Sequence, residues 1–107
     1  MFHYTDASGF KAIGSQTTWV FKASKPPGHP LGAYFTTLGP DADKLAKRLR
    51  IPKAKTEYVF SFTGDTGLKP LDGARGQFVF YSSGDYAVDQ SRQIDSGPTS
   101  EVWERLS

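Results

Sequence analysis

Side chains that could do chemistry lie in two short stretches of this chain. The first is FHYTD at residues 2–6, in which His3 stands between two aromatic residues. The second is GAYFTTLGP at residues 32–40, which carries Tyr34 two positions after Gly32. Imidazole forms hydrogen bonds, and a tyrosine ring can stack on another ring. Both stretches have the aromatic and β-branched content of strands, so one sheet could bring them into a single site.

The sequence lacks the residues that several common kinds of functional site require. The 107 residues include no Cys, which excludes disulfides and thiolate metal sites, and two histidines, His3 and His29, argue against a zinc site. No GxSxG, HExxH, GxGxxG or phosphate-loop motif is present. The start GPDADK at residues 39–44 resembles a calcium loop but lacks the remaining ligand spacing. A net charge of +2 does not by itself indicate nucleic-acid binding.

Composition predicts one domain over residues 1–107 with an aromatic core. Eight Phe and five Tyr leave little room for other large core residues, and eleven Gly with seven Pro predict many turns. No apolar run reaches the length of a membrane span or of a signal-peptide core. We therefore expect a soluble domain without membrane contact, and the cellular compartment stays open.

The first half of the chain is predicted to hold three strands and two helices. The strands are 2–5, 17–22 and 32–38. A short helix over 7–15 can be capped by Thr5 or Asp6 and would place Phe10 and Ile13 on one face.

The second of these helices is expected over residues 41–50. Its apolar residues recur at the spacing i, i+3, i+4, i+7, acidic residues begin it and basic residues end it, and Pro52 follows. Its basic residues are expected on a solvated face, with a contact to an anionic partner as the alternative. The basic residues are Lys44, Lys47, Arg48 and Arg50.

Three strands are expected in the second half, at 57–62, 77–81 and 85–88. The last two would pair across the turn SSG as a hairpin. The polar tail ends in Val102, Trp103 and Leu106, which are expected to dock on the body of the domain. The result is an α+β fold with mainly antiparallel strands and two short helices, without a domain linker.

The two chemistry-bearing stretches together resemble a known family. His3-Tyr4-Thr5, followed about thirty residues later by the run from Gly32 to Pro40, is similar to the HYD-signature ADP-ribosyltransferase toxin domains. These are short members of the H-Y-E class that contains diphtheria toxin and the poly(ADP-ribose) polymerases. The resemblance covers roughly the first 40 residues, and the later strands match only in pattern. It implies an ADP-ribosyltransferase-like fold with two sheets.

The resemblance implies NAD+ as the substrate and no metal. The bond between nicotinamide and ribose would break through an oxocarbenium-like state, as in glycoside cleavage. His3 would bond the ribose hydroxyls, with a half-buried strand histidine bonded to backbone as the alternative. Tyr34 would stack on the nicotinamide ring, with a core aromatic as the alternative. Tyr4, Thr5 and Thr36 are further candidates for contact with the ligand. Gly32 would let the ligand approach the backbone.

The third residue of the class, a glutamate on a late strand, has two candidates. Gln77 has the better place in the chain order, and Glu57 stands in a similar frame. An amide at this position could bond a ribose hydroxyl but could not take a proton, which would favour hydrolysis of NAD+ by water. Glu101 and Asp89 are minor candidates. Lys25 and Arg75 are minor candidates for a contact to phosphate.

The family also implies partners and alternatives. A toxin or effector would have an unidentified macromolecular target and an immunity protein, and could be secreted or delivered as part of a larger toxin. One alternative is a nucleic-acid-modifying enzyme of the same fold, similar to RNA 2′-phosphotransferases. Another is a non-catalytic module that binds NAD+ or ADP-ribose.

Overall fold

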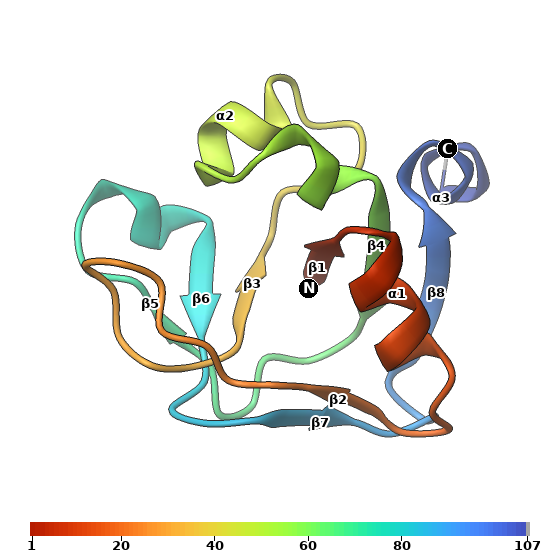
Figure 1. The fold of residues 1–107 in the computed structure, drawn as a ribbon, viewed down its shortest axis with the longest axis horizontal. Coiled ribbons are helices and arrows are strands. Elements are labelled where there is room, and N and C mark those ends of the chain that lie inside the picture. Colours follow the sequence, from red (N-terminus) through yellow and green to blue (C-terminus); the bar gives the residue numbers. More distant parts are fainter. Residues whose placement is uncertain (107) are drawn as a thin grey trace.

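A six-stranded antiparallel sheet carries most of the fold. In the computed structural model, which describes residues 1–106, the strand order is β5-β6-β3-β1-β4-β8 (Figure 1). The strands are β1 (Phe2–Thr5), β3 (Tyr34–Thr36), β4 (Tyr58–Phe62), β5 (Lys69–Pro70), β6 (Val79–Tyr81) and β8 (Gln93–Pro98). A second sheet, along the lower edge of Figure 1, pairs β2 (Trp19–Phe21) with β7 (Tyr86–Val88). The predicted α+β class with mainly antiparallel strands in two sheets is confirmed.

Within the described residues, three α-helices, and not two, connect and flank these strands. They are α1 (Ala7–Gly14), α2 (Leu45–Leu49) and α3 (Thr99–Leu106), with the short 3-10 helices η1 (Lys53–Thr56) and η2 (Ala74–Gln77). The predicted cap of α1 is Asp6, whose side chain accepts a hydrogen bond from the amide of Gly9 at 2.9 Å. Phe10 and Ile13 pack on the core as expected.

The helix predicted over 41–50 is shorter at both ends. Lys44 has a φ of 53° and Arg50 a φ of 56°, both in the left-handed region. An α-helix cannot continue through such residues, so α2 keeps only the five residues between them. The periodic pattern of apolar residues correctly predicted the helix, but it could not predict these two backbone conformations.

The predicted hairpin between 77–81 and 85–88 is wrong. Strand β6 pairs with β3 and β5, whereas β7 pairs with β2 in the other sheet. At the turn, the amide of Ser82 donates to the carbonyl of Ala33 at 3.0 Å and its hydroxyl donates to that of Gly84 at 2.6 Å. The first bond extends the contact of β6 to the residue before β3, and after this turn the chain crosses to β2, where Tyr86 and Val88 become core residues.

The six-stranded sheet is buried on both faces. An aromatic core between the two sheets contains Trp19, Phe21, Ala33, Phe35, Phe60, Phe62, Tyr86 and Val88. A second core on the opposite face contains Tyr4, Leu49, Val59, Leu71, Val79 and Val102. Strand β4 supplies both, because successive side chains of a strand point to opposite faces.

The C-terminal tail docks through one of its three predicted apolar residues. Val102 on α3 is fully buried, whereas Trp103 is 50% and Leu106 47% exposed. We expect Val102→Ala to lower the free energy of unfolding by about 1–3 kcal/mol, because it removes two methyl groups from a filled core. Trp103→Ala, the matched control on the same helix, should change it by less than about 1 kcal/mol. Urea unfolding followed by circular dichroism measures both, and equal losses would contradict this docking.

Candidate functional site

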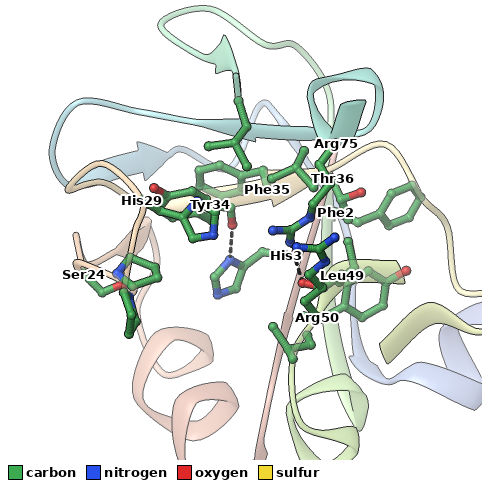
Figure 2. A pocket seen from close by; sticks show the side chains of 16 residues that line it. Phe2, His3, Ser24, His29, Tyr34, Phe35, Thr36, Leu49, Arg50 and Arg75 are labelled. Carbon is green, nitrogen blue, oxygen red and sulfur yellow. Dashed lines mark hydrogen bonds between the residues drawn. The ribbon is translucent and has the colours of Figure 1, made fainter. Parts of the chain in front are cut away.

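A pocket of about 370 Å³ opens beside β1 and β3 (Figure 2). One wall comes from the loop between β2 and β3 through Ser24, Pro26 and His29, and another from the segments around α2 and η2. His3 and Tyr34 both line it. The structure thus brings the two stretches FHYTD and GAYFTTLGP together at one cavity, in the size range of small-molecule sites.

The pocket lies where the six-stranded sheet comes apart. Strands β1 and β4 pair over four residues, but β1 and β3 pair only at Phe2 and Thr36. Beyond this pair, the Nδ1 atom of His3 lies 2.9 Å from the carbonyl oxygen of Tyr34, the bond dashed in Figure 2. The hydroxyl of Tyr4 donates to the carbonyl of Leu38 at 2.8 Å. At this seam between β1 and β3, the side chains of His3 and Tyr4 therefore make hydrogen bonds of the kind that backbone amides make between the other strands.

His3 is held as a neutral imidazole. Its ring lies against Phe21, Phe35 and Phe60, with ring centroids 4.6, 5.5 and 6.5 Å away. Burial lowers the pKa of His3 to about 4, although its bond to the Tyr34 carbonyl raises it. Because a carbonyl only accepts, Nδ1 carries the proton, and Nε2 is left as an acceptor. His3 is thus a strand histidine bonded to backbone, as in the alternative interpretation, and it also lines the pocket.

Tyr34 presents a ring, not a free hydroxyl. Its hydroxyl donates to the carbonyl of Pro30 in the same loop. Tyr81 stacks on the ring at 5.7 Å with an interplanar angle of 19°, and His29 meets it edge-on at 6.4 Å. Burial is the main reason that the pKa of the Tyr34 hydroxyl is raised. The ring is therefore fixed in position, half-buried, at the wall of the pocket.

The hydroxyls of the other predicted contact residues serve the fold. Thr36 donates to the carbonyl of Phe78 at 2.5 Å and accepts from the amide of Leu38 at 3.0 Å. Thr5 is buried against Gly9 and does not line the pocket. Burial, and then the charge of Asp41, raises the pKa of the Tyr4 hydroxyl, which stays protonated.

The structure gives a different reason for a glycine at position 32 from the predicted approach of a ligand. A Cβ atom at this residue would lie 1.9 Å from the backbone oxygen of Ser82. What approaches the glycine in this structure is the backbone of Ser82. Gly32 is not one of the residues that line the pocket.

Neither candidate for the third residue reaches the pocket. Gln77 is the last residue of η2 and does not start a strand, and it is exposed. Glu57 is exposed between η1 and β4, where its carbonyl accepts from the amide of Thr99 at 2.9 Å. The minor candidates Asp89 and Glu101 are also exposed and outside the pocket. The expected triad is therefore not assembled, and no Asp or Glu among the described residues lines the pocket.

Two arginines supply the charge of the pocket instead. Arg50 is exposed, as expected for the basic residues at 41–50, and it also lines the pocket, as does Arg75, a minor candidate for a phosphate contact. Arg75 donates to the carbonyl of Leu49 at 2.7 Å. The sequence carries no local signal for Arg50, because its place depends on the left-handed turn at the end of α2. Lys25 lies outside the pocket and donates to the carbonyl of His29 at 3.2 Å.

Comparison of the chain with family models, with curated proteins and with solved structures found no match. Within residues 1–106, no three His, Asp or Glu side chains are grouped as a metal ion would require. No helix in that range is both long and apolar enough to cross a bilayer.

Proposed function

We propose that this protein binds NAD+ and cleaves its bond between nicotinamide and ribose, as an NAD+ glycohydrolase or a mono-ADP-ribosyltransferase. The observation that carries the proposal is that His3 and Tyr34, from distant parts of the chain, line one pocket at a split in the sheet. These are the two residues for which the resemblance to ADP-ribosyltransferase domains is most specific. The positive charge of Arg50 and Arg75 suits a ligand that carries phosphates.

Each of the two residues would have one task. Nε2 of the neutral His3 would accept a hydrogen bond from a ribose hydroxyl, because Nδ1 already donates to Tyr34. Tyr34 would stack on the nicotinamide ring with the face that Tyr81 does not cover. Both groups are held by the fold before the ligand arrives, which lowers the entropy lost on binding.

The bond can break without an acid from the protein. Water would attack C1′ of the ribose while the C1′–N1 bond breaks and its electron pair leaves with nicotinamide. Nicotinamide departs neutral, and the attacking water loses one proton to solvent, giving ADP-ribose. Among residues 1–106, no carboxylate that would activate a protein nucleophile lines the pocket. Hydrolysis of NAD+ is therefore favoured over transfer to a protein side chain.

A second candidate function follows from the same missing carboxylate. A pocket that binds NAD+ or ADP-ribose but lacks a residue to steady the developing positive charge could serve as a non-catalytic binding module. Binding and turnover must therefore be measured separately.

The test is the release of nicotinamide from NAD+ by the purified chain, followed by chromatography, with calorimetry for binding. We expect Tyr34→Leu to lower turnover at least about tenfold, since it removes the stacking ring. Tyr34→Phe keeps the ring and should retain most of the activity. Gln77→Ala, at the exposed position outside the pocket, is the matched control and should leave turnover unchanged.

Each outcome separates the candidates, once circular dichroism shows that the variants are folded. Release that Tyr34→Leu abolishes and Tyr34→Phe retains would support the enzyme. Binding of NAD+ without release would establish the binding module. Loss of turnover in Gln77→Ala alone would place the chemistry away from this pocket. An absence of both binding and release would overturn the proposal.

A further inference from the structure

Two guanidinium groups from separate elements line the same pocket. Arg50 directly follows α2, and Arg75 lies in η2 (Figure 2). The bond from Arg75 to the carbonyl of Leu49 joins η2 to the residue that precedes Arg50. The Nε atom of Arg75 is buried and has no hydrogen-bond partner among the described residues. A buried donor without a partner costs free energy, and this one belongs to a residue that lines the pocket.

The charges of the two arginines are not offset by the protein. Burial, and then the positive charge of Arg50, lowers the pKa of the Arg75 guanidinium. No acidic side chain among the described residues lines the pocket, and neither arginine takes part in an ion pair there. Two like charges beside one cavity destabilise each other until an anion binds between them.

The backbone at Arg50 supplies an independent observation. With φ 56° and ψ 45°, Arg50 occupies the left-handed position that ends a helix, where glycine or asparagine is usual. Strained residues of this kind are concentrated at functional sites, where the side chain has a use. Lys44, at the other end of α2, has a φ of 53° and is exposed like Arg50, but it lies outside the pocket. The chain thus contains its own comparison for Arg50.

We propose that Arg50 and Arg75 form a subsite for a diphosphate group, so that the pocket binds nucleoside diphosphates and dinucleotides by their pyrophosphate. Two planar guanidinium forks can each bond two phosphate oxygens, which a pair of lysines could not match. That the diphosphate is the one in NAD+ rests on the proposed function. The pocket would then favour NAD+ and ADP-ribose over nicotinamide riboside, which lacks the diphosphate.

The test measures binding of inorganic pyrophosphate, ADP-ribose and nicotinamide riboside at low salt, by calorimetry and by NMR of the arginine Nε–H signals. Pyrophosphate should shift the Arg75 signal. Arg50→Gly should weaken pyrophosphate and ADP-ribose about 10- to 100-fold, the usual range for one charge-assisted contact. Lys44→Gly, the matched control, should leave both affinities unchanged. Both variants should keep or raise the thermal midpoint, because glycine relieves the positive φ.

The outcomes distinguish the subsite from the proposed function. If pyrophosphate binds and Arg50→Gly weakens its binding, the subsite is supported. If NAD+ then binds no better than pyrophosphate, only the assignment of NAD+ as the ligand is overturned. If Arg50→Gly and Lys44→Gly bind pyrophosphate and ADP-ribose equally well, the subsite is overturned. The same holds if pyrophosphate leaves the wild-type Arg75 signal unmoved.

Discussion

Gly32→Ala is expected to lower the free energy of unfolding by about 3 kcal/mol or more, and with it the thermal midpoint by more than about 10 °C. The new Cβ atom would lie 1.9 Å from the oxygen and 3.1 Å from the carbon of the Ser82 carbonyl. Neither side can move freely. Gly32 exchanges two 2.9 Å hydrogen bonds with Ser24, and the Ser82 amide is bonded to Ala33. Thermal unfolding followed by circular dichroism measures the loss.

Gly84→Ala is the control for this prediction. Gly84 lies in the turn that follows Ser82, and a Cβ atom there would meet no atom within 4 Å. Its substitution should therefore change the thermal midpoint by only a few degrees. If Gly32→Ala proved as stable as Gly84→Ala, the close approach of the two backbones would be wrong, and the position would be open to a ligand after all.

Acid should destabilise the protein through His3. In the unfolded chain a histidine has its ordinary pKa of 6.5, whereas burial lowers that of folded His3 to about 4. Between these values the unfolded state binds the proton and the folded state does not. The contribution of His3 to stability is therefore complete above about pH 6.5 and falls as the pH is lowered to about 4, by roughly 3 kcal/mol. Urea unfolding at a series of pH values measures this slope.

His3→Gln isolates the contribution of the imidazole. Its amide can still donate a hydrogen bond to the Tyr34 carbonyl but does not titrate, so its stability should change little between about pH 5 and 6.5. Four carboxylates also have pKa values lowered from 3.8, so they lower stability from about pH 5 downward; they are Asp6, Asp85, Asp89 and Asp95. A variant with the slope of the wild type would show that another group is responsible.

Local chemistry made much of the first half predictable. The strand at residues 2–5, the cap at Asp6 and the packing of Phe10 follow from residues next to one another, and the structure has all three. The meeting of His3 and Tyr34 at one pocket also agrees with the expectation that two strands would bring them together. That expectation used the resemblance to a family as well as the pattern.

The features that were missed depend on distant contacts. The turn SSG resembles a hairpin turn, but β7 completes the aromatic core only by pairing with β2, about 65 residues earlier in the chain. Gln77 matches a strand start in sequence, yet η2 follows the positive φ of Gly73 and leaves it exposed. Arg50 enters the pocket through one backbone conformation that helix propensity does not encode.

The seam between β1 and β3 divides the sheet into two halves of three strands each. Strands β5, β6 and β3 form one half, and β1, β4 and β8 the other. Across the seam there is one backbone pair, with side-chain bonds from His3 and Tyr4. The pocket thus lies at the boundary between these two halves of the sheet. A ligand that bonds His3 in one half and stacks on Tyr34 in the other would connect the two halves, so that its binding would make the sheet more rigid.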